Sequence, residues 1–427
     1  MRKTVFSVDK RECCSCGLCE GVCQSKAIFF KRDEQGFYRP VINQDLCEKC
    51  GICYDVCPGD KVEENSIYRT LGQSMPDDYI KGNVLECFNA KMTDVDLREK
   101  CTSGGMVTGI ISYLLKKQQY DVAFCVNTYD YSSQVKTVPI NSIEDLDRTV
   151  QSRYVTVSHS ELVDYILHNR DKRVIIVAVG CAMTGIRTII KKYRLDKDKY
   201  LCLGLFCACQ YSYRTWDYFR LYSPKKVLEE LQFRCKNGRK YAYGMIKAKF
   251  DNEYKVMHTI HRAYIKNDFA MERCLYCTDL LNVFSDISFG GNNTKSKDGE
   301  SCTVIVRTSI GNQILKEMYS EKLFLQEDIL IDEIRDVQGR YVRGLYADIR
   351  EKLDGGSHIY RDRTCANELE WAPRVRELKK TLERKTWALN SKNLKKLWLI
   401  NQLRFLKLRI TNRKYLLELK PVGKMKK

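Results

Sequence analysis

The sequence predicts three consecutive parts: a small α+β domain, a larger mixed α/β domain and a basic helical tail at the C-terminus. Three observations predict this division. Two cysteine runs of the same spacing lie near the N-terminus, apolar segments with strand and helix periods alternate through the middle, and the end of the chain is rich in Lys and Arg. A length of 427 residues agrees with two or three globular units.

The use of cysteine depends on the compartment. The first residues, MRKTVFSVDKRE, contain no apolar run of signal-peptide length, and no stretch reaches the roughly 18 apolar residues that a membrane span needs. We therefore expect a cytoplasmic protein, in which thiols stay reduced. The 21 cysteines then indicate metal binding or catalysis rather than disulfides.

The two cysteine runs are an internal duplication. Residues 13–23 read CCSCGLCEGVC and residues 47–58 read CEKCGICYDVCP, so the spacing C-x2-C-x2-C-x3-C occurs twice. Three thiolates on such a loop hold three corners of an iron–sulfur cubane, and the fourth reaches the neighbouring cluster. The spacing predicts two [4Fe-4S] clusters, one held by Cys13, Cys16, Cys19 and Cys57 and the other by Cys47, Cys50, Cys53 and Cys23.

Zinc is the alternative for these cysteines, but a structural zinc site prefers two well-separated CxxC pairs. Residues 1–62 resemble a two-cluster bacterial ferredoxin, in which a proline follows the last ligand. Pro58 agrees with that pattern, whereas Gln24 stands at the matching place in the first run. Cys14 lies outside the spacing, and we interpret it as a bystander thiol.

The polar, turn-rich residues 63–83 are expected to form a linker, and regular elements follow it. The strand-helix-strand order around residue 180 predicts a parallel pair buried on both faces. In chain order, we expect a helix at 105–117, a strand at 121–126, a helix at 160–169, a strand at 173–179, a helix at 182–193, strands at 200–206, 286–289 and 302–308, and a helix from Asn312.

Four further cysteines form a second candidate site. Cys181 and Cys207 each follow a predicted parallel strand, so both lie at the sheet edge where open α/β sheets bind ligands. Cys274 and Cys277 form a lone CxxC that suits redox, zinc or cluster chemistry. Together these thiols could hold a third [4Fe-4S] cluster, although buried cysteines also serve as small apolar residues.

A glycine-rich turn precedes the helix at 105–117. Thr102, Ser103, Gly104 and Gly105 form a TSGG turn, whose amides and helix dipole suit a phosphate group. The same turn is equally an ordinary helix N-cap. The turn alone therefore does not identify a cofactor.

Several phrases resemble one family between about residues 84 and 310. These phrases are CTSGGMVTGIISYLL, QSRYV, AVGCAMTGI, LFCACQYSYRTW, RCLYCTD, DISFGG and ESCTVIVRT. They are similar to the beta-subunit family of coenzyme F420 (deazaflavin) hydrogenases and dehydrogenases. The resemblance implies a mixed α/β flavin-binding domain, with an N-terminal part at 84–157 and a C-terminal part at 158–350.

The resemblance also implies cofactors and residues. FAD would lie with its phosphates at Thr102, Ser103, Gly104 and Gly105, near Ser152 and Tyr154, and the third cluster would be held by Cys181, Cys207, Cys274 and Cys277. Three phrases depart from the family. AVGCA replaces GTPCQ, CAC replaces CHG, and GG at 290–291 replaces GD. The lost His and Asp remove two groups that could bind a flavin or move a proton.

These features favour a flavin-dependent iron–sulfur oxidoreductase that links one-electron transfer through clusters to two-electron chemistry at FAD, with a redox protein as donor or acceptor. No catalytic residue is identified. The first alternative is a non-catalytic electron-transfer subunit that feeds a partner enzyme, and the lost His and Asp favour it. A second alternative is a flavin-free regulatory or scaffold protein. Neither the substrate nor the oligomeric state is indicated by the sequence.

The basic tail, residues 351–427, has three open interpretations. From residue 374 on it contains 18 Lys or Arg against three Glu, and its apolar residues suit one or two amphipathic helices. It could lie on the anionic inner face of the membrane, or pack on its own body or a partner. Specific nucleic-acid binding is not expected, because no recognised motif is present. By analogy alone, bacterial relatives suggest a role in surface-polysaccharide biosynthesis.

Overall fold

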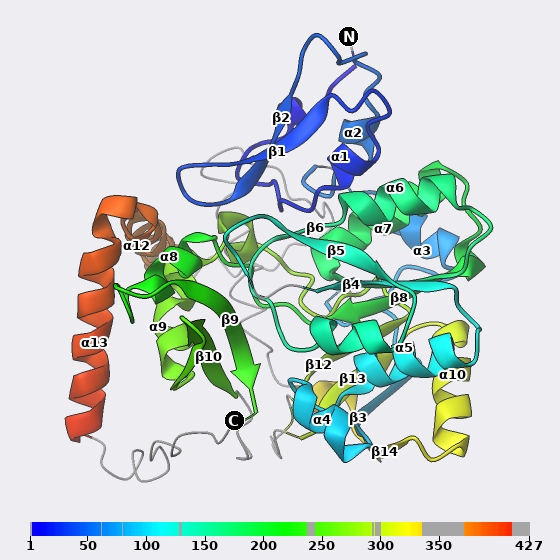
Figure 1. Cartoon of the computed structure of the whole chain (residues 1–427). Coiled ribbons are helices and arrows are strands. Elements are labelled where there is room, and N and C mark those ends of the chain that lie inside the picture. The colour runs from blue at the N-terminus through cyan, green and yellow to red at the C-terminus, as the bar shows by residue number, and fades with distance from the viewer. Residues whose placement is uncertain are drawn as a thin grey trace.

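The computed structural model describes residues 2–60, 62–78, 80–127, 130–236, 244–292, 294, 300–334 and 371–411. A small N-terminal module sits at one end of a mixed α/β body, and two long helices near the C-terminus lie along the side of that body (Figure 1). The three predicted parts are therefore present as a small ferredoxin region, a mixed sheet domain and C-terminal helices.

The N-terminal module, residues 2–60, repeats one small unit. Each cysteine run bends into a short helix directly after a glycine, Gly17 or Gly51, whose positive φ of 74° or 82° favours a residue without a Cβ atom. Antiparallel strands join the two units. The elements are α1 (Leu18–Gly21), β1 (Ile28–Arg32), β2 (Tyr38–Ile42) and α2 (Ile52–Asp55).

The body is organised around a nine-stranded mixed sheet. Its four neighbouring central strands run parallel, and the predicted pair from 173–179 and 200–206 is among them, with Val174 opposite Tyr200. In spatial order the strands are β14 (Phe324–Asp328), β3 (Glu86–Met92), β13 (Cys302–Val306), β12 (Ile287–Gly291), β8 (Tyr200–Leu205), β7 (Val174–Val179), β4 (Val122–Val126), β5 (Val135–Ile140) and β6 (Val157–Ser158).

Helices cover both faces of this sheet, as the continuous apolar strands require (Figure 1). Val174 and Ile176 of β7 pack in one apolar core with α6 (Ser160–His168) and α7 (Gly180–Lys192). Ile175 faces the opposite core with α5 (Met106–Lys116) and α10 (Ser309–Ser320). A short helix, α4 (Val95–Lys100), lies between β3 and α5 in the chain.

A second, antiparallel sheet was not predicted. Its order is β11 (Glu253–Met257), β10 (Met245–Phe250) and β9 (Leu228–Cys235), and the helices α8 (Arg214–Arg220) and α9 (Ile260–Phe269) flank it in the chain. Along β9, buried residues such as Leu231 and Phe233 alternate with more accessible polar ones. This mixed composition hides the strand in a search for continuous apolar runs.

The C-terminal helices pack on the body. They are α12 (Trp371–Leu389) and α13 (Leu394–Thr411), so the prediction of helices in the tail is confirmed for residues 371–411, and the rest of the predicted tail, 351–370 and 412–427, lies outside the described residues. The predicted amphipathic pattern is absent from α13, whose apolar residues are spread around the helix. Ala388 and Leu397 are completely buried in the core that also contains α8 and α9 residues. Among the described residues, the structure has no helix that is both long and apolar enough to cross a membrane.

The segment at 63–83 differs from the expected irregular linker, because it contains the helix α3 (Glu64–Thr70). The helix forms because Ile67 and Tyr68 are buried, and the Tyr68 ring lies 5.0 Å from that of Phe284. Beyond α3, the buried guanidinium of Arg307 donates hydrogen bonds to the carbonyls of Lys81 and Asn83, at 2.8 and 2.9 Å. The segment is thereby fastened along the body. The domain boundaries themselves stay predictions.

Candidate functional site

The first predicted ligand set of the module draws on both cysteine runs. We call it the first thiol group, and it consists of Cys13, Cys16, Cys19 and Cys57. Cys19 interacts electrostatically with Cys57 and Cys13, and Cys16 interacts with Cys19 and Cys57. Burial, followed by the neighbouring thiols, raises the pKa of Cys19 well above its ordinary value. An empty site would therefore hold neutral thiols, and iron would have to displace their protons.

The second thiol group combines the runs in the opposite way. Cys53 interacts with Cys50 of its own run and with Cys23 of the first run. Cys47 packs in the same apolar cluster, whereas Cys50 is exposed. The fourth cysteine of each run, Cys23 or Cys57, thus lies with the first three cysteines of the other run, as the ferredoxin spacing predicts. The assignment of these eight residues as ligands remains a prediction.

Cys14 occupies the junction between the module and the body, although the sequence indicated only a bystander. Its side chain is buried beside Cys16 and Cys181, and the interactions with these two thiols lower the pKa of Cys14. Cys16 belongs to the first group and Cys181 to the body. Cys14 therefore connects the module to the second candidate site. The spacing rule could not find it, because this role depends on docking.

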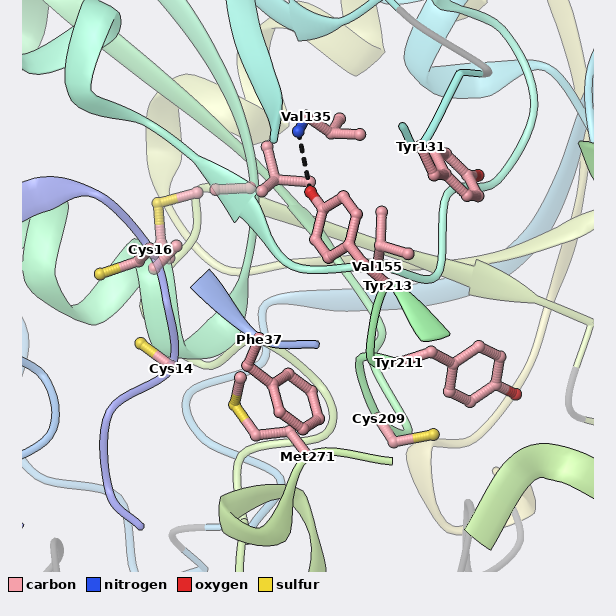
Figure 2. Packing of buried hydrophobic residues seen from close by; sticks show 14 of the residues in the cluster. Cys14, Cys16, Phe37, Tyr131, Val135, Val155, Cys209, Tyr211, Tyr213 and Met271 are labelled. Carbon is pink, nitrogen blue, oxygen red and sulfur yellow. Dashed lines mark hydrogen bonds between the residues drawn. The ribbon is translucent and has the colours of Figure 1, made fainter. Parts of the chain in front are cut away.

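Other contacts hold the module in this position. The backbone N–H of His159 donates to the carbonyl of Cys16 at 2.8 Å, and the N–H of Tyr213 donates to that of Gly36 at 2.9 Å. Figure 2 shows Cys14, Cys16 and Phe37 of the module in one core with Cys209, Tyr211 and Met271 of the body. The module is therefore part of a continuous interior with the body.

The structure gathers the four dispersed cysteines around one loop. Cys181 lies in the first turn of α7 and interacts electrostatically with Cys207, which follows β8. The N–H of Cys207 donates to the carbonyl of Leu280 at 3.1 Å, and the N–H of Gln210 lies 3.4 Å from the sulfur of Cys274. The Cys277 thiol, in the same loop, lies 3.6 Å from the carbonyl oxygen of Asp279.

We call Cys181, Cys207, Cys274 and Cys277 the body cysteines. They lie at or beyond the carboxyl ends of β7 and β8, together with the loop that follows α9. In the described ranges, no three His, Cys, Asp or Glu side chains converge closely enough to hold one metal ion. The assignment of the body cysteines to a third cluster therefore stays a prediction.

Arg273 joins the body cysteines to the module, a role that the sequence did not indicate. It directly precedes the CxxC, and its buried guanidinium donates to the carbonyls of Glu12 at 2.6 Å and Pro58 at 2.7 Å. These carbonyls flank the first and last cysteines of the two runs. The guanidinium also acts electrostatically on Cys57 and Cys181. The sequence around Arg273 gave no signal, because its two carbonyl partners lie 261 and 215 residues away.

The predicted flavin residues meet at the N-terminus of α5. The hydroxyls of Thr102 and Ser152 lie 3.1 Å apart, and no side chain caps α5 at Gly105. The ammonium of Lys236 donates to the Ser103 carbonyl at 2.8 Å, and burial lowers the pKa of Lys236. Uncapped amides beside a cation suit a phosphate. Packing explains why residue 104 is a glycine, since a Cβ there would lie 2.3 Å from the carbonyl oxygen of Ala90.

Tyr154 connects this turn to the cysteine region. Its ring stacks on Tyr211 with centroids 5.4 Å apart, and the Arg262 guanidinium lies 4.8 Å from its centre. Tyr211 in turn interacts with the Cys209 thiol, and burial raises the pKa of Tyr211 well above its ordinary value. Aromatic side chains thus connect Tyr154 to Cys209, two residues after Cys207.

One departure from the family phrases, GG at 290–291, has a local explanation in its packing. A Cβ on Gly290 would lie 2.0 Å from the Phe206 ring, and one on Gly291 would lie 2.9 Å from the guanidinium of Arg234. The Phe206 ring and the Arg234 guanidinium therefore occupy the space that larger residues at 290 and 291 would need. The replacement of GD by GG changes both shape and charge at this sheet edge.

The module and the body both match known protein families. Residues 87–164 match the N-terminal part, and residues 171–329 the C-terminal part, of the family described as coenzyme F420 hydrogenase/dehydrogenase, beta subunit. Residues 40–60 match the 4Fe-4S binding domain. The two beta-subunit matches cover most of the body but end before the C-terminal helices.

Several characterised proteins are similar to this chain. One subunit of the F420H2 dehydrogenase of Methanosarcina mazei is 25% identical over 326 residues, which are 74% of this chain and 84% of that protein. The coenzyme F420-dependent sulfite reductase of Methanocaldococcus jannaschii is 23% identical over 82% of this chain, but this chain spans only about half of that enzyme, 52%.

One solved structure shares the fold. A chain of the F420-reducing [NiFe] hydrogenase complex of Methanosarcina barkeri aligns with a TM-score of 0.51 and 19% identity. The alignment covers 69% of this chain and 100% of that chain. At this identity, the likeness supports the fold alone.

Proposed function

We propose that this chain, which belongs to the coenzyme F420 hydrogenase/dehydrogenase beta-subunit family, carries single electrons between a redox protein and a flavin through three [4Fe-4S] clusters. Within that family the chain is an iron–sulfur oxidoreductase subunit. The observation that carries the proposal is the position of Cys14. It contacts Cys16 of the module and Cys181 of the body at once.

The proposed route begins at the outer thiol group, where Cys50 is exposed. It continues to the inner group around Cys16 and Cys57, which is buried at the junction. Cys14 and Arg273 then hold this group against Cys181. The direction of electron flow follows from the cluster potentials, which burial and hydrogen bonds adjust.

The body cysteines would hold the third cluster, and the turn at 102–105 would hold the FAD phosphates. A bound flavin exchanges hydrides for pairs of single electrons. The Lys236 ammonium would place positive charge beside the phosphates, and Thr102 and Ser152 would offer hydroxyls. Tyr154 and Tyr211 would fill the space between the two centres with aromatic rings and exclude water.

Anaerobic purification tests this proposal. We expect about 12 iron atoms per chain and bound FAD that a low-potential donor reduces. Cys207→Ala should lower the iron content to about 8 per chain, because the third cluster would lose a ligand. Cys202→Ala is the matched control, since Cys202 is buried in β8 and should leave the iron unchanged. An unchanged iron content in Cys207→Ala would contradict the assignment.

The alternative function is a non-catalytic electron-transfer subunit that feeds a partner enzyme. Its supporting observation is the sheet edge at Gly290 and Gly291, where Phe206 and Arg234 fill the space beside the glycines. Such a subunit would contain the clusters without a flavin. Cofactor extraction of the same preparation decides between the two, since clusters without FAD would favour the electron-transfer subunit. Assembly with other subunits, as in the complexes of the relatives, belongs to both proposals.

Membrane attachment stays a prediction for the tail, and one observation favours it. Leu399, Leu403 and Leu406 are about half exposed along α13, among lysines and arginines, although the helix has apolar residues on its buried side as well and is therefore not amphipathic. We expect binding to anionic vesicles at low salt and its loss when these leucines become glutamates. Deleting the whole tail is the poorer test, because α12 and α13 pack on the body. Equal vesicle binding by the variant would contradict membrane attachment. The suggested role in surface-polysaccharide biosynthesis likewise stays a prediction.

A further inference from the structure

We propose that Lys385 of the C-terminal helix α12 raises the reduction potential of the cluster held by the body cysteines. The inference rests on the proposed function, because it requires the third cluster. It assigns a redox role to a part of the chain that lies beyond the matched family region, which ends at residue 329.

Lys385 reaches into the interior where the three parts of the molecule meet. Its side chain is only 4% exposed, and its ammonium donates a hydrogen bond to the carbonyl of Ala270, in the loop that leads to Cys274. The same ammonium lies 5.3 Å from the centre of the Phe37 ring of the N-terminal module. The Lys385 ammonium, which belongs to the tail, therefore contacts both the body and the module.

The surroundings of Lys385 contain cysteine and carboxyl groups. Its ammonium interacts electrostatically with Glu272, Cys274 and Cys209, and with the guanidinium of Arg39 of the module, whose like charge opposes that of Lys385. Burial lowers the pKa of Lys385 to about 8, so the group still carries its charge through most of the neutral range. A cation in a poorly solvated site stabilises an added electron nearby more than one in water does. The reduced form of the adjacent cluster should therefore be favoured.

Neighbouring residues hold Lys385 in place. Arg384 forms a two-pronged ion pair with the buried carboxylate of Asp268, at 2.5 and 2.9 Å. One turn further along, Ala388 and Leu389 are buried in the main core. These contacts fix the helix independently of Lys385. A neutral residue at 385 should therefore remove the charge without releasing α12.

The test compares reduction potentials in the purified holoprotein. We expect Lys385→Met to lower the midpoint potential of the third cluster by about 59 mV, which equals a tenfold change in a one-electron equilibrium. A redox titration followed by electron spin resonance measures the midpoint. Lys380→Met is the matched control, since Lys380 is an exposed lysine of the same helix and its loss should leave the midpoint unchanged.

A second variant separates charge from packing. Lys385→Gln removes the charge but keeps a donor for the Ala270 carbonyl, so it should lower the midpoint similarly, and it decides the question if the Met variant loses iron. A midpoint equal to that of Lys380→Met in a protein with 12 irons would overturn the role of Lys385 alone. Wild-type protein with only 8 irons would overturn both this role and the proposed function.

Discussion

The two cysteine runs have the same spacing and the same backbone, yet one faces the body and the other faces outward. Ser15 and Lys49 occupy equivalent places, and both have positive φ angles, 55° and 53°. In the first run the fourth position before the helix is the buried Cys14, whereas the second run has the exposed Glu48. The two runs are therefore similar loops, and they differ because the first is packed against the body and the second faces solvent. We call them the inner repeat and the outer repeat.

The difference extends to the residues that pack between the helices. A Cβ on Gly21 of α1 would lie 2.6 Å from Val163, so only glycine allows α1 to approach α6 this closely. The equivalent residue of α2 is Asp55, whose side chain reaches Lys192 at 2.8 Å across the surface. The inner repeat uses small residues for contact, and the outer repeat uses charge.

Removing one predicted ligand from each run should give the largest difference in electron transfer between the inner and outer repeats. Cys16→Ala and Cys50→Ala should each lower the iron content from about 12 to about 8 per chain. Only Cys16→Ala should interrupt electron passage to the flavin from every donor, since Cys16 contacts Cys14. Cys50→Ala should affect protein donors and leave reduction by a small chemical donor. Equal loss with both donor types in both variants would contradict the inner and outer assignment.

Arg273→Met tests how the inner side is fastened. The substitution removes two hydrogen bonds from a charged donor to buried carbonyls, so we expect docking of the module to weaken by about 4 kcal/mol. Limited proteolysis between residues 63 and 83 measures release of the module. Lys266→Met, on the neighbouring helix α9, is a control that should leave the cleavage rate unchanged. An unchanged rate in Arg273→Met would contradict the proposed fastening.

Alanine at the two equivalent glycines sharpens the comparison. Gly51→Ala should destabilise the holoprotein by about 1 kcal/mol, because its φ is left-handed. Gly17→Ala has the same backbone strain and also a Cβ 2.0 Å from the Ser158 hydroxyl, so it should cost about 3 kcal/mol. Chemical denaturation under anaerobic conditions gives both values. Equal costs would mean that the body does not restrict the inner repeat.

Surface ion pairs should contribute least. Lys26 pairs with Asp164 at 2.6 Å and Lys192 with Asp55 at 2.8 Å, and all four side chains are at least about one third exposed. Each lysine-to-alanine change should alter stability by less than about 1 kcal/mol. The loss should shrink further in high salt. A larger effect in the same denaturation assay would show that these pairs hold the module.

The sequence predicted those features that depend on local pattern. The spacing of the eight cysteines follows from cluster geometry, and the continuous apolar runs at β7 and β8 follow from burial on both faces. Helix α3 was missed because only Ile67 and Tyr68 give it an apolar face. Cys14 and Lys385 were missed for another reason. Cys14 meets Cys181, and Lys385 meets Ala270 and Phe37, across long distances in the sequence, so only the folded chain brings them to the body cysteines.

The distance along the chain between Arg273 and its two carbonyl partners also orders assembly. The hydrogen bonds to Glu12 and Pro58 span 261 and 215 residues, whereas the eight predicted cluster ligands of the module lie within residues 13–57. Contacts close in sequence form early, and contacts between distant segments form late. During synthesis, the module is complete long before Arg273 leaves the ribosome. The inner thiols therefore stay accessible to solvent until the body closes over them.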